Sequence, residues 1–338
     1  MTEPAYTLPA GARVLVTGAS GFTGSVLVRK LVVGGARVRA IARASSNLAP
    51  LKDLTVEWIR GEVYDPDTVR RAMTDMEYVI HVAAAYREAG IRDEVYRKVH
   101  VDSTRLLAET ACKIPAFRRF VHVSTVGVHG HIEHPPADET APFRPGDIYQ
   151  VTKAEAETWL HAFAREHGLA YSVIRPAAIY GPGDRRLLKV FRMANHAVFP
   201  LLGSGRCLYH LVHVEDLADS MILAAAHPAA VGEAFIAGSP EASSLEAIGR
   251  TIAGALGRPF RPIRLPAWPF FLAADVCECF CKPLGISPPL YRRRVAFFTK
   301  DRAFDTRKIR ERLGFKNRYS DADGLAATTR WYRDHGWL

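Results

Sequence analysis

The chain has 338 residues, of which 48% are hydrophobic and 24% are charged. This balance excludes a disordered or membrane-spanning chain and predicts a soluble globular protein. The formal net charge of +10 suits anionic ligands such as dinucleotides. The densest basic run, three arginines at 292–294, is too short to carry a nucleic-acid interface, so we expect no nucleic-acid partner.

The N-terminal residues, MTEPAYTLPAGARVLVTG, contain an acid at Glu3 and only a short apolar run. We interpret them as leading into a first strand and not as a signal peptide, which predicts a cytoplasmic protein. Five cysteines, an odd number, predict reduced thiols without a disulfide framework. Three of them, in CECFC at 277–281, lack the C-x-x-C spacing of zinc sites. We therefore predict no metal site and a buried, thiol-rich helix there.

From residue 12 onward, apolar strands alternate with amphipathic helices. Strands are expected in RVLVTG, ARVRAIAR, LTVEWIRGE, MEYVIHVAA, FRRFVHVST and AYSVIRPAAIYG. This rhythm predicts the α/β class, with a Rossmann-type doubly wound parallel sheet and a dinucleotide-binding domain at 1–181. Segments rich in proline and glycine follow. Residues 182–338 are therefore expected to form a smaller, mainly helical substrate-binding lobe, with some segments returning to the sheet.

The stretch VTGASGFTG places three glycines directly after the first strand, at the start of a helix. Glycine lets the backbone turn sharply and approach a pyrophosphate closely, and the helix N-terminus offers free N–H groups. The spacing is one residue longer than the standard dinucleotide fingerprint. A plain tight turn is the alternative, which the position after the first strand disfavours. The predicted cofactor contacts are Gly18, Ser20, Gly21, Phe22, Thr23 and Gly24.

The second strand ends at Arg43, and no acid occurs between Glu3 and Asp53. A carboxylate there would accept from both ribose hydroxyls, whereas a guanidinium suits a 2′-phosphate. We therefore favour NADP over NAD as the cofactor, with a merely solvent-facing arginine as the alternative. After the third strand, Glu62 is placed to accept from the adenine amino group, with Val63 beside it.

The stretch DIYQVTK places Tyr149 and Lys153 one turn apart on one face of a helix. A phenol is a poor base at neutral pH, and a nearby ammonium favours its ionised form. Such a pair is common by chance. Upstream, however, FVHVSTVGVHG ends a strand with Ser124 and Thr125, whose hydroxyls could bond a substrate oxygen at the ligand-binding edge of the sheet. Together these four residues predict a catalytic site for alcohol or ketone chemistry.

Over essentially its whole length the chain resembles the extended short-chain dehydrogenase/reductase family. The matching segments are TGASGFTG, HVAAAY, HVSTVGVHG, YQVTK, RPAAIYGPGD, HVEDLA and FFTKDRAFDTRKIRERLGF. The resemblance implies that Tyr149 is the general acid/base, Lys153 its activator and Thr125 the triad hydroxyl, with Ser124 its neighbour. It also implies a homodimer formed through paired helices. The further cofactor-lining residues are Ala83, Ala84, Ala85 and Pro176.

Two places depart from the family pattern. His100 stands where the family usually has asparagine, so the role of that amide in proton relay or positioning is not carried over. Tyr209 and His210 stand where sugar-nucleotide epimerases and dehydratases place an arginine and an aspartate that hold the substrate diphosphate. The pattern looks more like the 3β-hydroxysteroid dehydrogenase and sterol-modifying branch. It implies a small apolar alcohol or ketone, such as a steroid or lipid, as substrate.

Two alternatives stay open. One is a sugar-nucleotide epimerase or dehydratase with tightly held NAD, and the other is a cofactor-binding regulator on the same fold. The segment 265–285, LPAWPFFLAADVCECFCKPLG, is apolar but too short and too interrupted to span a bilayer. It has three interpretations, which are a peripheral membrane contact, an apolar lid over the substrate, and ordinary packing in the lobe.

Overall fold

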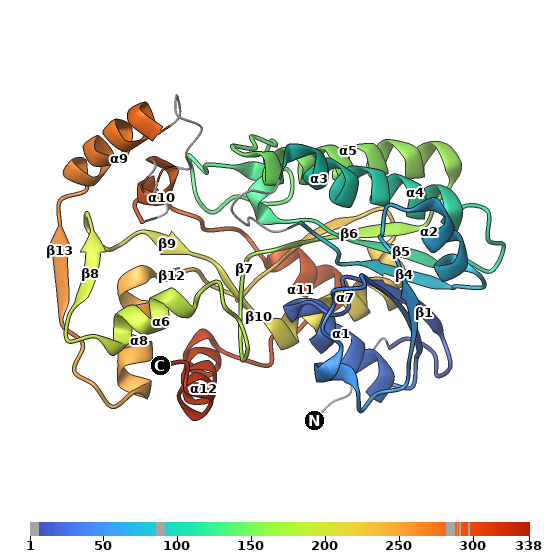
Figure 1. The fold of residues 1–338 in the computed structure, drawn as a ribbon, viewed down its shortest axis with the longest axis horizontal. Helices are drawn as coiled ribbons and strands as arrows, with labels where there is room; N and C mark the ends of the chain where they lie inside the picture. The colour runs from blue at the N-terminus through green and yellow to red at the C-terminus, as the bar shows by residue number, and fades with distance from the viewer. Residues whose placement is uncertain (1–6, 86–91, 282–287, 289, 291, 297) are drawn as a thin grey trace.

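The computed structural model describes residues 7–85, 92–281, 288, 290, 292–296 and 298–338, so Tyr86 and positions 282–285 of the apolar segment lie outside the described residues. Its centre is a seven-stranded parallel sheet in the order β11-β6-β5-β4-β1-β2-β3 (Figure 1). This confirms the predicted doubly wound α/β sheet. The strands are β1 Arg13–Thr17, β2 Arg37–Ala42, β3 Val56–Arg60, β4 Tyr78–His81, β5 Arg119–Val123, β6 Tyr171–Pro176 and β11 Ala234–Ala237.

Helices cover both faces of this sheet (Figure 1). On one face, Met73, Leu107 and Leu160 of α2, α4 and α5 belong to one buried cluster. On the other, Leu27 of α1 and Met221 of α7 belong to a second cluster, to which α11 also contributes. The bounds are α1 Phe22–Val33, α2 Pro66–Met73, α4 Ser103–Ala111, α5 Ile148–His167, α7 Val214–Ala226 and α11 Arg307–Leu313. Both faces are therefore shielded from water, as a parallel sheet requires.

The helical segment between β4 and β5 is divided into three parts. α3 spans Asp93–Arg97, a π-helical turn η2 spans Lys98–Asp102, and α4 follows. A π turn adds one residue to the helical repeat and often marks a functional position. Here it carries His100, whose side chain is fully buried.

A second core lies outside the sheet, where Phe191, Phe199 and Tyr332 are buried. Its helices are α6 Leu188–Asn195, α8 Leu245–Ala255 and α12 Asp321–Asp334. Short strands pair around it: β7 Ala178–Tyr180 with β10 Leu211–His213, β8 Phe199–Leu202 with β13 Pro262–Leu265, and β9 Leu208–Tyr209 with β12 Ser243–Ser244. The single-turn 3-10 helices are η1 Ala49–Leu51, η3 Val126–His129 and η4 Pro228–Ala230. Residues beyond 181 form most of the second core. They also contribute to the large sheet and its helical layers, because α7, β11 and α11 belong there.

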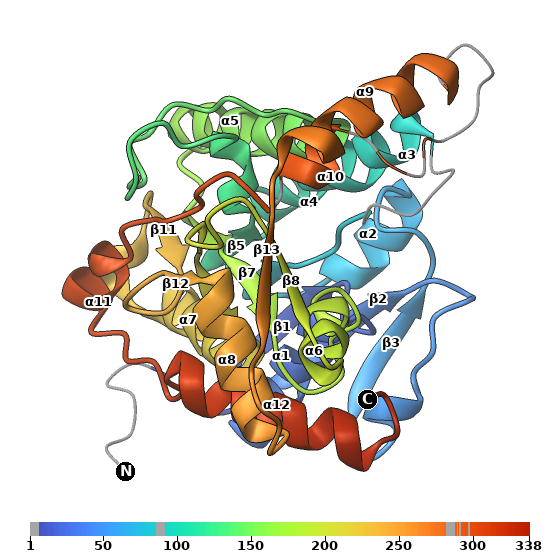
Figure 2. The same ribbon diagram turned by 90° about the vertical axis from the view of Figure 1, so that its left-hand side faces the viewer.

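The helix α9, Trp268–Cys281, projects from this lobe beside the short α10, Arg292–Ala296 (Figure 2). The predicted burial of its cysteines is wrong, since Cys279 is exposed and Cys277 is half-buried. Hydrophobic composition alone did not reveal that this helix has one face turned to solvent. Within the described part of the chain, no helix is both long enough and apolar enough to cross a bilayer.

Candidate functional site

Most of the predicted site residues lie at or directly after the ends of six neighbouring strands. Because all six strands are parallel, their carboxyl ends lie at one edge of the sheet, where ligands bind in open α/β folds. The order reverses between β1 and β4, which opens the edge at that point. The residues that the strands deliver there are Gly18 after β1, Arg43 after β2, Glu62 and Val63 after β3, Ala83, Ala84 and Ala85 after β4, Ser124 and Thr125 after β5, and Pro176 at the end of β6.

The glycine loop leaves no room for side chains. Gly18 has φ +69°, and a Cβ there would lie 2.8 Å from the Cα of Ala83. A Cβ on Gly24 would lie 2.1 Å from the Gly18 carbonyl oxygen, so the loop folds tightly onto the first turn of α1. Gly21 is the N-cap of α1 and has no side chain to satisfy the N–H groups that follow. Ser20, Phe22 and Thr23 lie in the same turn. This arrangement fits a dinucleotide pyrophosphate.

Arg43 is exposed just beyond β2, and its carbonyl oxygen accepts from the Arg60 guanidinium at 2.8 Å. Glu62 is half-buried, and Val63 is buried beneath it at 7% exposure. Arg43 is therefore an exposed residue directly after the end of β2. Which cofactor it prefers stays a prediction.

Tyr149 and Lys153 lie in the first two turns of α5, whose N-cap Asp147 accepts from the Gln150 amide at 2.7 Å. Tyr149 is half-buried, whereas Lys153 is almost completely buried. The Lys153 ammonium donates to the Val123 carbonyl, the last residue of β5, at 2.8 Å. Burial lowers the pKa of Lys153 to about 8, and the carboxylate of Glu157 opposes this shift. The structure thus brings the pair to the end of β5.

The two hydroxyls after β5 differ in access. Ser124 is 3% exposed, and its backbone amide donates to the Ile174 carbonyl at 2.7 Å. Thr125 is half-buried, and its Oγ1 accepts from the Gly127 amide at 3.0 Å. A hydroxyl that accepts from the backbone keeps its own proton to donate. Of the two, Thr125 is the better placed to donate to a ligand oxygen.

A buried ion pair beneath this helix was not foreseen. Glu157, one turn beyond Lys153, is fully buried and lies 2.6 Å from the guanidinium of Arg175 on β6. The guanidinium also donates to the Glu139 carbonyl at 2.8 Å. Removing one partner of such a pair costs about 3–5 kcal/mol because the other charge is left unpaired. The interval of four residues places Glu157 on the same helix face as Tyr149 and Lys153, but this spacing does not reveal that its carboxylate is buried.

His100 lies between the segment that follows β4 and helix α5. Its Nε2 accepts from the Ala85 amide at 3.1 Å, and its Nδ1 lies 2.7 Å from the Thr152 hydroxyl. The imidazole meets the ring of Tyr149 edge to face, with 5.2 Å between the centroids. Burial, followed by the positive charge of Lys153, lowers the pKa of His100 to about 2. Burial likewise lowers the pKa of His81 to about 3. Both imidazoles are therefore neutral at physiological pH.

The two residues at the diphosphate-binding positions are turned inward. His210 is buried; its Nε2–H donates to the Ser239 carbonyl at 2.6 Å, and its Nδ1 accepts from the Phe304 amide at 3.2 Å. Tyr209 is buried beside Leu211 and lines a small apolar cavity of the second core. Neither side chain offers a charge to a ligand. Across the described ranges, no group of three histidine, cysteine or acidic side chains could hold a metal ion.

A model described as the NAD dependent epimerase/dehydratase family matches residues 14–238. The chain is 30% identical over 350 residues to a dTDP-glucose 4,6-dehydratase from Streptomyces niveus, covering 96% of this chain and 93% of that protein. It is also 30% identical over 351 residues to a 3-beta-hydroxysteroid dehydrogenase from Mycolicibacterium neoaurum, with 99% and 94% covered. The crystal structure of gox2253 superposes with a TM-score of 0.82 at 28% identity, covering 96% and 99%.

The buried histidines predict how stability depends on pH. A histidine whose pKa is lowered on folding binds fewer protons in the native than in the unfolded state, so stability falls as the pH drops below the unfolded value of 6.5. Each contributes roughly 1 kcal/mol per pH unit in that window. We expect the free energy of unfolding, measured with urea, to fall steeply between about pH 6.5 and about pH 5.

His122 provides a matched variant for this measurement. Burial lowers its pKa well below the usual range, and within the described residues neither ring nitrogen has a hydrogen-bond partner. The free energy of unfolding of His122→Leu should therefore fall less steeply with decreasing pH than that of the wild type. His131→Gln, at an exposed position, should leave the slope unchanged. If the free energy of unfolding of His122→Leu fell with decreasing pH as steeply as that of the wild type, His122 would not contribute to the loss of stability in acid.

Proposed function

Because the chain belongs to the NAD-dependent epimerase/dehydratase family, we propose that it interconverts a secondary alcohol and a ketone on an apolar, steroid- or lipid-like substrate. The family assignment makes it an NAD-dependent oxidoreductase by class and confirms the family inferred from the sequence motifs. The substrate class is our own inference. The observation that carries it is the environment of Tyr209 and His210.

In this proposal the proton is handled by α5 and the end of β5. The Tyr149 hydroxyl gives its proton to a ketone oxygen, or its ionised form takes the proton of an alcohol, and the ammonium of Lys153 favours the ionised phenol. The Thr125 hydroxyl donates to the same substrate oxygen as charge develops on it. The bound dinucleotide supplies the hydride donor or acceptor. The edge-on histidine and the half-buried position of Tyr149 leave one side of the phenol for the substrate.

An apolar substrate is supported by what stands at positions 209 and 210. A diphosphate needs cations or several free donors to offset its charge. At these positions the chain has a buried phenol and a neutral imidazole whose two nitrogens are both engaged by backbone groups. Burial lowers the pKa of His210, which keeps that ring uncharged. The side chains at positions 209 and 210 themselves therefore provide no cation for a sugar nucleotide, although the guanidinium of Arg302 lies 5.9 Å from the centre of the Tyr209 ring.

A sugar-nucleotide epimerase or dehydratase with held NAD is the second candidate. Two observations favour it: the 30% identity to a dTDP-glucose 4,6-dehydratase, and the exposed Arg206 four residues before His210. In that case the hydride returns to the product and no cofactor is consumed. Net cofactor turnover separates the two candidates.

The acid/base assignment predicts the effect of Tyr149→Phe. This change removes the hydroxyl that carries the proton and keeps the ring, so turnover should fall by about 10²–10⁴-fold while affinity for the cofactor stays close to that of the wild type. The assay follows the absorbance of reduced nicotinamide with a panel of sterols, aliphatic ketones and sugar nucleotides. Retained turnover in the variant would remove Tyr149 from its role. Conversion of a sugar nucleotide without net absorbance change would replace the first candidate by the second.

We also propose that the protein prefers NADP within a family whose description names NAD. The support is the exposed Arg43 after β2, in a segment without an acid to bond the ribose hydroxyls. Arg43→Ala should weaken NADP binding about 10- to 100-fold and leave NAD binding unchanged. Arg37→Ala, at the opposite end of the same strand, removes the same charge and serves as the control. An unchanged ratio of the two dissociation constants in Arg43→Ala would refute the role.

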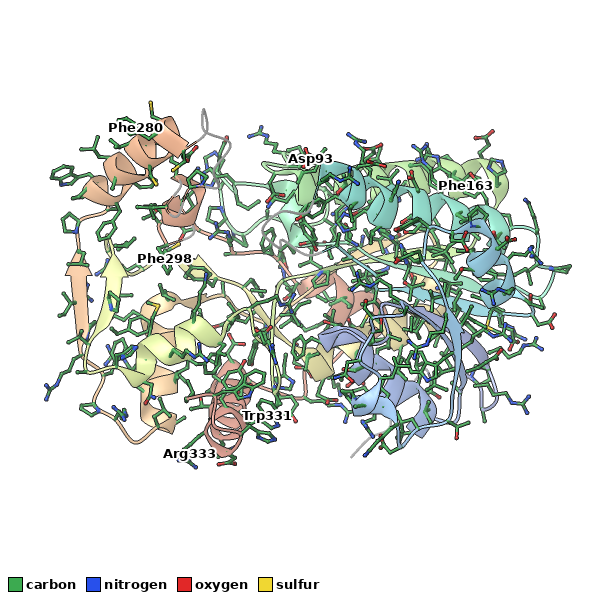
Figure 3. The ribbon with its side chains drawn as sticks, in the orientation of Figure 1. Asp93, Phe163, Phe280, Phe298, Trp331 and Arg333 are labelled. Atoms are coloured by element: carbon green, nitrogen blue, oxygen red, sulfur yellow. The ribbon has the colours of Figure 1, made fainter. Side chains whose placement is uncertain are left out.

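Of the three interpretations of 265–285, we propose the peripheral contact with a lipid surface. Trp268, Leu272, Val276 and Phe280 follow one another at intervals of four along α9 and are 50–72% exposed. They form a single apolar stripe, with Phe280 near the outer end of the helix (Figure 3). The two acids of the helix both contact Arg292: Asp275 lies 2.5 Å from its guanidinium, and Glu278 accepts from its backbone amide at 2.7 Å. An amphipathic helix with tryptophan on its apolar face suits the interfacial region of a membrane.

The lipid proposal is tested by co-sedimentation with vesicles of phosphatidylcholine and phosphatidylglycerol. The wild type should sediment with them, and Trp268→Ser/Phe280→Ser should reduce the bound fraction about tenfold, because two large apolar side chains lose their burial in lipid. Val33→Ser, an exposed apolar position on α1, should have no effect. A wild type that stays in the supernatant, or an equal loss for Val33→Ser, would rule out α9 as the contact.

We further propose a homodimer formed through α4 and α5. On the outer side of these helices, Trp159 and Phe163 stack at 4.6 Å between centroids, and the guanidinium of Arg105 lies over the Trp159 ring at 5.5 Å. Both aromatic side chains remain partly exposed, and Figure 3 shows Phe163 on the outer helix layer. Aromatic residues and arginine are the residues most often found at such interfaces.

A further inference from the structure

The segment Ala83–Ala85, which follows β4 at the cofactor edge, is held at both ends through buried histidines. At its start, the Ala83 amide donates to Thr17 Oγ1 at 3.1 Å, and this hydroxyl lies 2.7 Å from Nδ1 of His81. Nε2 of His81 lies 3.1 Å from Ser103 Oγ, which donates to the Val99 carbonyl at 2.6 Å. Since Ser103 uses its proton on that carbonyl, it accepts from His81 Nε2–H, and Thr17 donates to Nδ1.

At its other end, the Ala85 amide donates to Nε2 of His100 at 3.1 Å. A backbone amide can only donate, so Nε2 is the acceptor and the proton of the neutral ring is on Nδ1. Nδ1–H then donates to Thr152 Oγ1 at 2.7 Å, and Thr152 donates to the Ile148 carbonyl at 2.8 Å. This second series of bonds ends in the turn of α5 that carries Tyr149.

Every donor and acceptor in the second series is used, and its direction is fixed. The proton of Thr152 is directed to a helix carbonyl, which cannot pass a proton on. His100, Thr152 and Ala85 are all buried, so no water-exposed atom of the imidazole is available to exchange a proton with solvent. The low pKa of His100 agrees with a ring that stays neutral. The imidazole thus fixes the distance between the Ala85 amide and Thr152 and the direction of the two hydrogen bonds that join them.

We propose that His100 is a positioning residue, which as the neutral Nδ1–H tautomer accepts from the backbone amide of Ala85, holds the segment Ala83–Ala85 at a fixed distance from the Tyr149 turn and takes no part in proton transfer. The proposal rests on the proposed function insofar as Tyr149 is the acid/base. Its consequence is that the phenol exchanges its proton on the ligand side and not through the helix layer beneath. The edge of the His100 ring against Tyr149 sets the orientation of the phenol at the same time.

Two amide replacements separate the two bonds. The amide nitrogen of asparagine reaches the place of Nδ1, so His100→Asn keeps a donor toward Thr152 and leaves the Ala85 amide unpaired. Glutamine reaches the place of Nε2, so His100→Gln keeps an acceptor for Ala85 and loses the bond to Thr152. In a titration that follows NADPH fluorescence, His100→Asn should bind NADPH about tenfold more weakly, and His100→Gln should bind close to wild type. A purely structural role would affect both alike.

Controls keep this test independent of folding. His122→Leu removes a neighbouring buried histidine and should leave NADPH affinity unchanged. If the His100 variants do not fold, Thr152→Ser and Thr152→Val take their place, with affinity kept in the first and lowered about tenfold in the second. Folded His100→Asn that binds NADPH as tightly as wild type, or equal affinities for both members of the Thr152 pair, would overturn the proposal.

The tautomer is measured by ring-nitrogen NMR of the full chain with labelled histidine. The signals that disappear in His100→Gln should be those of an Nδ1–H imidazole and should not move between about pH 5 and about pH 8. A titrating ring, or an Nε2–H tautomer, would overturn the proposal. Neither readout uses a substrate. If the substrate proved to be a sugar nucleotide, the proposed function would therefore be wrong, and the inference about His100 would be unaffected.

Discussion

The hydrogen bond from the Lys153 ammonium to the Val123 carbonyl is the contact on which the geometry of the site depends. It joins the helix that carries Tyr149 to the end of β5. A buried ammonium is unfavourable without compensation. Here Glu157, one turn along the same helix, provides it, and Arg175 of β6 in turn compensates Glu157. Three charged groups, each of which would be unfavourable if buried alone, thus fix α5 to the adjacent strands β5 and β6.

Much of the large lobe could be predicted because its signals are local. Continuous apolar runs bounded by glycine mark buried parallel strands, and the glycines after β1 mark a turn that nothing larger can occupy. The π turn at Lys98–Asp102 was not predictable, since one inserted residue leaves the helical pattern on both sides intact. Apart from β7, which lies within the expected strand segment AYSVIRPAAIYG, the two- to four-residue strands of the second core were missed for another reason. Their pairing is decided by tertiary contacts and not by their own sequence.

In the site, too, features with a local sequence signal could be predicted, and contacts between distant residues could not. The spacing of Tyr149 and Lys153 is visible within seven residues. The bond between His100 and Thr152, by contrast, joins residues 52 apart and depends on how two helices pack. Sequence reasoning marked His100 as a departure from the family pattern but could not show what the ring contacts. Burial of an ion pair is also invisible in sequence, because a glutamate at that helical position is equally common on a solvated face.

The return of the chain to the large sheet has a consequence for how the molecule folds. β11 pairs with β6 only after α6, the short strands β7 to β10 and α7 have been synthesised, because all of them precede β11 in the chain. A polypeptide that stopped at residue 181 would leave the backbone edge of β6 unpaired and the buried side chains of Val173 and Ile174 partly uncovered, which is the kind of edge that promotes aggregation. The two lobes are therefore interleaved in the order of synthesis, and neither can be completed from a contiguous piece of the gene.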